Sequence, residues 1–131
     1  MIFVDSNIPM YLVGGSHPNK TNAQRLVESL VEQRERLITD AEVLQEILHR
    51  FIAINRLDAV QPAFDALLRI TDDVLSIDKR AVERAKEMVM GTPRLSARDA
   101  VHLAIMEHNN INRILSFDQG FDAFPGITRL T

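Results

Sequence analysis

The stretch IFVDSN, residues 2–7, joins a short apolar run of branched and aromatic residues to an abrupt polar ending. This pattern is typical of a buried strand that is followed by a turn. A second stretch of the same kind, RILSFD, occupies residues 113–118 near the other end of the chain. Each predicted strand is therefore followed closely by an acid, Asp5 in the first case and Asp118 in the second.

Between these stretches, short apolar runs alternate with segments whose apolar residues recur at helical spacing. The pattern predicts further strands at residues 36–39, 73–77 and 127–130, and helices at about residues 22–35, 41–55, 58–70, 79–90 and 96–109. Residues 5–9, which end in Pro9, are interpreted as a turn. Strands that alternate with helices indicate an α/β fold, here a three-layer α/β/α domain with a mainly parallel central sheet.

Composition narrows the class of protein further. A chain of 131 residues, 46% of them hydrophobic, favours a single domain over residues 1–131. No apolar run approaches the length of a membrane span and the start lacks a signal peptide, so we expect a cytoplasmic protein with no membrane partner. The absence of cysteine excludes thiolate nucleophiles and cysteine-based metal sites. A net charge of −3 argues against a protein that coats nucleic acid, but it leaves a nuclease open.

Four acids are candidates for one functional site. Asp5 and Asp118 follow strands, and Glu46 lies in the second turn of the helix that follows the strand at residues 36–39. Ligands of parallel sheets bind outside the carboxyl ends of the strands, so these three side chains should gather at one edge. Asp99 lies in the first turn of the helix at residues 96–109, and its spacing alone does not place it there.

Clustered carboxylates repel one another unless one of them takes up a proton or a cation binds. Oxygen ligands suit hard cations, so Mg²⁺ or Mn²⁺ is the expected cofactor. Such an ion activates water and neutralises charge on a phosphoryl oxygen, which is the chemistry of a nuclease. The phosphates of a substrate should also meet Arg94 or Arg98, which flank Asp99.

Each acid also has an ordinary structural role open to it. Asp5 and Asp118 could form turns, Asp99 matches a capping box with Ser96, and Glu46 could pair with Arg50.

Three further acids rank lower as candidates. Glu42 is explained by a capping box with Thr39, and Asp78 by an N-cap. Asp122 is a second-rank metal ligand or a turn residue.

Other chemistries find little support in the sequence. The histidines at positions 17, 49, 102 and 108 form no zinc motif and are interpreted as surface or core residues. The chain contains no glycine-rich loop that would cradle a nucleotide phosphate, so we expect no nucleotide cofactor.

In the order of its motifs, the chain resembles the PIN domain, specifically the VapC-like toxins of toxin–antitoxin pairs. The matching segments are VDSN at residues 4–7, VLQE at 43–46, ARDAVHLA at 97–104 and LSFDQGF at 115–121. The resemblance implies a metal-dependent endoribonuclease with Asp5, Glu46, Asp99 and Asp118 as its acidic set, so it places Asp99 in the site. It also implies that Ser6, Asn7 and Ser116 lie near the metal.

The same resemblance implies partners as well as an RNA substrate. A VapC-like toxin would be inhibited by an antitoxin whose C-terminal helix covers an apolar groove of the early helices and directs a basic residue at the acids. Helices 41–55 and 58–70 carry more apolar positions than a core-facing stripe needs, which supports such a groove. A homodimer is expected on the same family grounds.

Three alternatives stay open at this point. The first is a housekeeping PIN nuclease in RNA processing or DNA repair, which the sequence separates poorly from a toxin. The second is a Mg²⁺-binding receiver-like signalling domain, although Ser6 and Asn7 stand where a second acid would be needed and no lysine follows Lys86. The third is a binding module in which all four acids are turns and caps.

Overall fold

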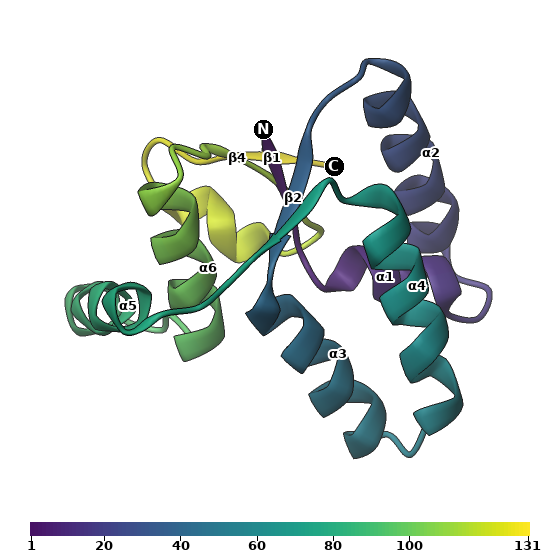
Figure 1. The fold of residues 1–131 in the computed structure, drawn as a ribbon, viewed down its shortest axis with the longest axis horizontal. Coiled ribbons are helices and arrows are strands. Elements are labelled where there is room, and N and C mark those ends of the chain that lie inside the picture. The colour runs from purple at the N-terminus through teal and green to yellow at the C-terminus, as the bar shows by residue number, and fades with distance from the viewer.

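The computed structural model describes residues 1–131 as a sheet with helices packed on both of its faces (Figure 1). The strands are β1 (Ile2–Val4), β2 (Leu37–Asp40), β3 (Asp73–Leu75), β4 (Arg113–Leu115) and β5 (Thr128–Leu130). The α-helices are α1 (Asn7–Val13), α2 (Pro18–Glu32), α3 (Ala41–Ala53), α4 (Val60–Ile70), α5 (Lys79–Gly91) and α6 (Ala97–His108). Two short 3₁₀ helices, η1 (Leu57–Ala59) and η2 (Gln119–Ala123), precede α4 and follow β4.

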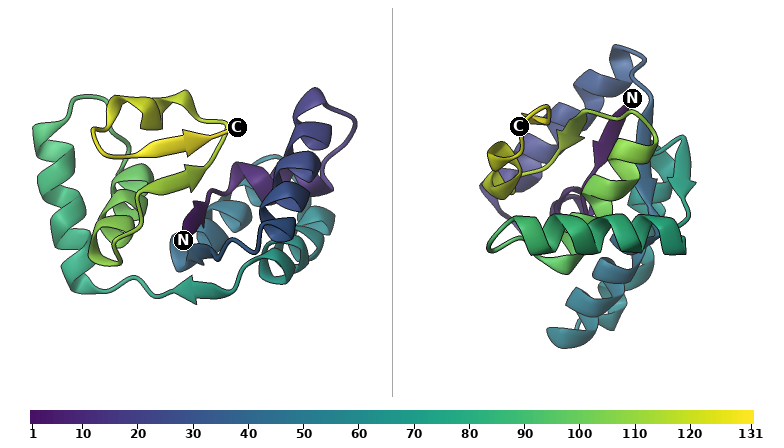
Figure 2. Two further views of the ribbon diagram at one scale, coloured as in Figure 1. Left: turned by 90° about the horizontal axis from the view of Figure 1, so that it is seen from above. Right: turned by 90° about the vertical axis from the view of Figure 1, so that its left-hand side faces the viewer.

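All neighbouring strands are parallel, in the order β3-β2-β1-β4-β5. Central β1 pairs with β2 and with β4, and Phe3 is in register with Ile38 on one side and Ile114 on the other. Helices α1, α2 and α4 lie on one side of the sheet, whereas α5 and α6 lie on the other (Figures 1 and 2). The predicted three-layer α/β/α architecture with a parallel sheet is therefore confirmed.

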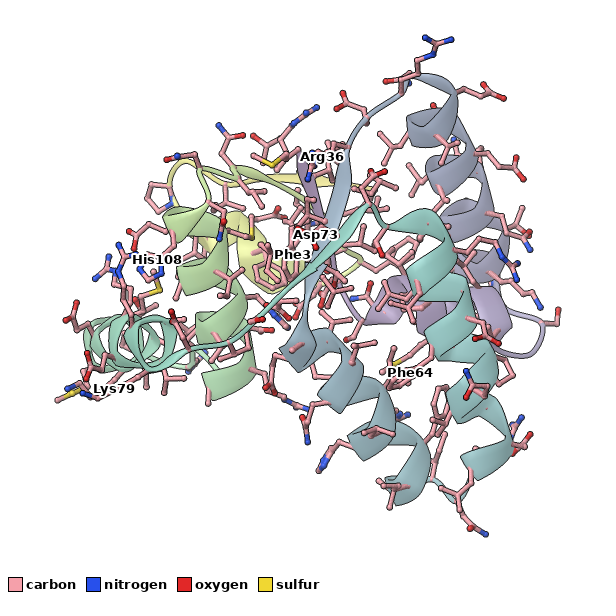
Figure 3. All side chains as sticks on the ribbon, in the orientation of Figure 1. Phe3, Arg36, Phe64, Asp73, Lys79 and His108 are labelled. Atoms are coloured by element: carbon pink, nitrogen blue, oxygen red, sulfur yellow. The ribbon has the colours of Figure 1, made fainter.

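Apolar side chains from both helical layers meet at the sheet. Phe3 is fully buried and lies at the centre of the molecule between the two layers (Figure 3).

No helix combines the length and the apolar character that crossing a membrane would require.

The N-terminal region differs from the prediction. Residues 7–13 form helix α1 where a turn was expected, and Pro9 is compatible with it because the first helical turn has no intrahelical partner for an N–H group. Helix α2 begins at Pro18, four residues before the predicted start, with His17 as its N-cap. The His17 Nδ1 atom accepts a hydrogen bond of 3.0 Å from the Asn19 N–H.

The order of the strands creates a switch point beside β1. The chain runs from central β1 outward to β2 and β3, and then crosses the molecule to form β4 and β5. In parallel sheets, a crevice for ligands opens at the carboxyl ends of the strands where this order reverses. Here the two strands at that crevice are β1, followed by Asp5, and β4, followed by Ser116.

Candidate active site

A cavity of about 400 Å³ opens at the carboxyl ends of β1 and β4. Met10 is the one hydrophobic residue in its lining. The residues that line it are Asp5, Ser6, Asn7, Met10, Glu46, Arg50, Ser96, Arg98, Asp99 and Asp118. The structure thus brings together all four acids that the sequence singled out, including Asp99, which spacing alone could not place.

Asp5 is held rigidly at the end of β1. Its Oδ1 atom accepts a hydrogen bond of 2.8 Å from the Ser6 N–H, and its Oδ2 atom accepts one of 2.6 Å from the Ser116 hydroxyl. The Asn7 side chain adds a longer contact of 3.3 Å to Oδ2. Burial raises the pKa of Asp5 to about 6, because these hydrogen bonds and the charge of His102 offset the desolvation only in part.

Glu46 has a different environment, since its partner is a buried histidine. The His102 Nε2 atom lies 2.7 Å from Glu46 Oε1, and the Nδ1 atom of the same ring lies 2.8 Å from Asp40 Oδ2. Burial alone would raise the pKa of Glu46, but the hydrogen bond and charge of His102 outweigh it and lower that pKa. Burial opposes the charged imidazole too, yet the bonds to Asp40 and Glu46 raise the pKa of His102 well above its ordinary value.

Asp99 and Asp118 reach the cavity from α6 and from the segment between β4 and η2. Asp99 lies in the first turn of α6, where its N–H donates to the Ser96 hydroxyl at 3.1 Å. Burial raises the pKa of Asp99, and the charges of Asp118 and Glu46 raise it further. Asp118 is exposed, and its Oδ1 atom accepts a 2.8 Å hydrogen bond from the Gly120 N–H.

Two arginines stand at the rim of this acidic cavity. Arg98 and Arg50 are exposed and line it, and the charge of Arg98 contributes to lowering the pKa of Glu46. The structure gives Glu46 no ion pair with Arg50; its partner is His102. Arg94 precedes α6 in a loop, with a φ of 68°, and does not line the cavity.

Of the two capping predictions, the one for α3 is wrong and the one for α5 is confirmed. The predicted capping box of Thr39 and Glu42 is wrong, because Asp40 is the N-cap of α3 and accepts a 2.9 Å hydrogen bond from the Val43 N–H. Thr39 instead donates from its hydroxyl to the Val4 carbonyl at 2.9 Å. The predicted N-cap of α5 at Asp78 is confirmed by a 2.9 Å bond from Ala81.

Asp122, the second-rank candidate, is not brought into the cluster. Its carboxylate forms two hydrogen bonds with the Arg129 guanidinium, at 2.9 and 3.0 Å, and it does not line the acidic cavity. The Arg129 pair satisfies this carboxylate, which explains why it stays apart from the other acids.

Sequence reasoning missed Asp40 and His102. Each had a recognisable signal: Asp40 ends a predicted strand much as Asp5 does, and His102 stands three residues after Asp99, on the same face of a helix. Their importance lies in their mutual contact, which joins residues 62 positions apart in the chain. No local pattern encodes that contact.

The donor atoms of the cavity fit a hard divalent cation. One carboxylate oxygen each of Asp5 and Glu46 and one ring nitrogen of His102 lie within 4.8 Å of one another, and the carboxylates of Asp99 and Asp118 line the same cavity. Both ring nitrogens of His102 are already engaged by carboxylates, so the available set consists of oxygen atoms. Oxygen donors of this kind are those that Mg²⁺ and Mn²⁺ prefer.

A family model described as the PIN domain matches residues 2–127. The chain belongs to the PIN-domain family. Ribonuclease VapC13 of Mycobacterium tuberculosis is 59% identical over 130 residues, which cover 99% of each chain. Ribonuclease VapC23 of the same species is 35% identical over 118 residues, or 90% of this chain and 93% of that protein. The resemblance to VapC-like PIN domains inferred from the four motifs is thus confirmed.

Solved structures support the same fold. The toxin VapC20 of Mycobacterium tuberculosis, described as cleaving the sarcin-ricin loop, superimposes with a TM-score of 0.76 at 21% identity and covers 98% of this chain and 99% of its own. VapBC2 of Rickettsia felis, bound to a DNA fragment from its promoter, gives a TM-score of 0.74 at 14% identity with coverage of 99% and 98%. At such low identities the likeness concerns the fold.

The raised pKa of Asp5 predicts an unusual pH dependence for the metal-free protein. Between about pH 4 and pH 6 the folded state keeps a proton that the unfolded chain has released, so this group lowers the free energy of unfolding as the pH rises. The loss is complete above the folded pKa and amounts to about 1–3 kcal/mol. We therefore expect the free energy of unfolding of the wild type to fall by about 1–3 kcal/mol more than that of Asp5→Asn between pH 4 and pH 6.5. Urea unfolding in EDTA measures both values.

Asp58→Asn is the matched control for this experiment. Asp58 is exposed, and its hydrogen bond with Arg56 lowers its pKa. Its protonation therefore affects the free energy of unfolding only below about pH 4. Equal pH slopes in wild type and Asp5→Asn would contradict the account of Asp5.

Proposed function

We propose that this protein hydrolyses phosphodiester bonds of RNA with Mg²⁺ or Mn²⁺ held by Asp5, Glu46, Asp99 and Asp118. The observation that carries the proposal is the convergence of these four acids on one polar cavity. Membership of the PIN-domain family and the ribonuclease names of relatives such as VapC13 support the same reaction.

The charge balance of the cavity supports a cation in particular. Glu46 is hydrogen-bonded to His102, but Asp5 is not, and its hydrogen bonds together with the charge of His102 leave its pKa raised to about 6. Asp99 and Asp118 add further negative charge nearby. A divalent ion would remove the repulsion among these groups, which the protein itself leaves in place.

Each group of the cavity then has a task in the reaction. The bound cation would supply a Lewis acid that lowers the pKa of water and neutralises charge on a phosphoryl oxygen. Ser6 and Ser116 fix the orientation of Asp5 through their hydrogen bonds. Arg98 and Arg50, exposed at the rim, would bind a phosphate of the substrate and keep the scissile bond over the acids.

Replacement of a single acid by its amide tests the proposal. Asp5→Asn, Glu46→Gln, Asp99→Asn and Asp118→Asn should each reduce RNA cleavage at least about 100-fold, because a weakened Lewis acid removes several kcal/mol of transition-state stabilisation. EDTA should stop the wild-type reaction and Mn²⁺ should restore it. Cleavage of a labelled RNA on a gel measures each effect.

Glu42→Gln and Asp78→Asn are the controls, because both acids lie outside the cavity lining. They should retain cleavage near the wild-type rate. Undiminished cleavage in EDTA would overturn the metal mechanism, and a dispensable Glu46 beside an essential Glu42 would overturn the assignment on α3.

The position of Arg98 predicts its contribution to RNA binding. Arg98→Ala should weaken binding and reduce the slope of log K against log salt by about 0.7, the value of one phosphate contact with a single strand. Arg94→Ala is the matched control, since Arg94 does not line the cavity. Fluorescence anisotropy of a labelled RNA from low to moderate salt measures both slopes. Identical slopes in wild type and Arg98→Ala would remove Arg98 from the substrate path.

We also propose that the protein is the toxin of a toxin–antitoxin pair. Structural neighbours include a toxin–antitoxin complex from Klebsiella pneumoniae, with a TM-score of 0.71 and 17% identity, which covers 100% of this chain and 97% of its own. A groove of about 550 Å³ lies between α1, α2 and α4, with Val13, Val27 and Ile70 in its lining, and could bind an antitoxin helix. Helix α3, whose apolar positions were expected to support such a groove, does not line it. A second copy of this chain is the other partner that we propose, and exposed Ile52 and Leu57 offer it an apolar surface.

A cognate antitoxin should copurify with this protein when the neighbouring reading frame is coexpressed. The complex should cleave RNA poorly, and cleavage should rise once the partner is stripped away, because nothing in this chain covers the acidic cavity. Ribonuclease assays before and after stripping measure the change. A free protein that is harmless on expression and binds no partner would instead favour a housekeeping PIN nuclease.

A further inference from the structure

The Glu46 carboxylate is held by two buried side chains, His102 and Asp40, which are not among the four acids of the cavity. His102 is 0% exposed and lies between Asp40 and Glu46, with its two ring nitrogens 2.8 and 2.7 Å from their carboxylate oxygens. Ionised carboxylates only accept hydrogen bonds, so both ring nitrogens donate. The Glu46 Oε1 atom is thus engaged by His102, while Glu46 also lines the acidic cavity, where the Ser6 side chain contributes to lowering its pKa.

The imidazole ring has little freedom to move. Its centroid lies 5.1 Å from that of Phe3, at an interplanar angle of 45°, and Phe3 is itself fully buried at the centre of the molecule (Figure 3). Asp40 is equally fixed, because its other carboxylate oxygen caps α3 through the Val43 N–H at 2.9 Å. The ring therefore connects Glu46, in the second turn of α3, to Asp40 at the end of β2.

The same contact relates the two helices that carry acids. Glu46 belongs to α3, and His102 belongs to α6, on the same helical face as Asp99 three residues earlier. The bond from His102 to Glu46 therefore sets the position of the α3 acid relative to the α6 acid. A site that needs several carboxylates around one ion depends on such relative placement.

We propose that His102 is a positioning residue of the metal site: it holds Glu46 through Oε1 and directs Oε2 into the cavity, while Asp40 holds His102. The inference rests on the proposed function, in which Glu46 is a metal ligand. Direct ligation by His102 would be a different role, and the geometry disfavours it, because Nε2 would have to abandon Glu46 and His102 does not line the cavity.

Two conservative variants separate these roles. The side-chain nitrogen of Gln can take the place of His Nε2 and donate to Glu46, whereas that of Asn can take the place of Nδ1 and donate to Asp40. His102→Asn should bind Mn²⁺ about 10- to 100-fold more weakly than wild type, the usual effect of a lost outer-shell partner. His102→Gln should bind Mn²⁺ at least about tenfold more tightly than His102→Asn.

Titration calorimetry of Mn²⁺ binding is the measurement, with urea unfolding of the same samples. Each variant keeps one of the two ring hydrogen bonds, so the two should have similar stability and differ in metal affinity. If the histidine were purely structural, the two variants would again have similar stability, but they would also bind Mn²⁺ with the same affinity. His49→Asn is the control, because His49 is exposed on α3 three residues from Glu46 and should bind Mn²⁺ as wild type does.

The outcomes are distinct. Equal weakening in both variants, or no weakening in either, overturns the positioning role. A wild-type protein that binds no Mn²⁺ overturns the proposed function, and this inference with it. Should His102→Asn fail to fold, NMR of the wild type decides: both ring N–H signals of His102 should persist in saturating Mg²⁺, and loss of the Nε2–H signal would indicate direct ligation and overturn the proposal.

Discussion

Repulsion among carboxylates at the carboxyl ends of β1 and β4 is the constraint on which the rest of this site depends. Asp5 and Glu46 are 4% and 8% exposed, so water screens their charges poorly. The protein compensates them unequally. Glu46 is hydrogen-bonded to the charged imidazole of His102, which lowers its pKa, whereas for Asp5 the charge of His102 and the hydrogen bonds offset burial only in part, and the pKa is about 6. The fold thus compensates the charge of Glu46 more completely than that of Asp5, and this difference supports the proposed binding of a divalent ion beside Asp5.

The topology explains how these groups meet. The reversal of strand order beside β1 brings the ends of β1 and β4 together, and the Ser116 hydroxyl bonds Asp5 there at 2.6 Å. The helices α3 and α6 approach the same point from different parts of the chain, and they deliver Glu46 and Asp99. Because strands and packed helices carry the acids, their relative positions are fixed before any ligand arrives. Carboxylates that are already in position need little rearrangement when a cation binds, and such preorganisation favours binding.

Much of this arrangement could be predicted from the sequence, because buried parallel strands and amphipathic helices have distinct periods. The strand before Asp5, the cap at Asp78 and the convergence of strand-linked acids all follow from local patterns. Helix α1 did not, since Pro9 suggested a turn and its tolerance in a first turn depends on where the helix begins. The roles of Asp40 and His102 were missed for a deeper reason. They act through a contact between distant segments, and no local spacing specifies it.

Anomalous scattering from crystals grown with Mn²⁺ tests the central claim most directly. The account predicts manganese in the acidic cavity, about 2.0–2.3 Å from oxygens of Asp5 and of at least one other acid, with His102 still bonded to Glu46. Crystals of Asp5→Asn should show a weaker peak or none. A wild-type crystal without manganese in this cavity, or with the ion bound to the imidazole nitrogen of His102, would contradict the account.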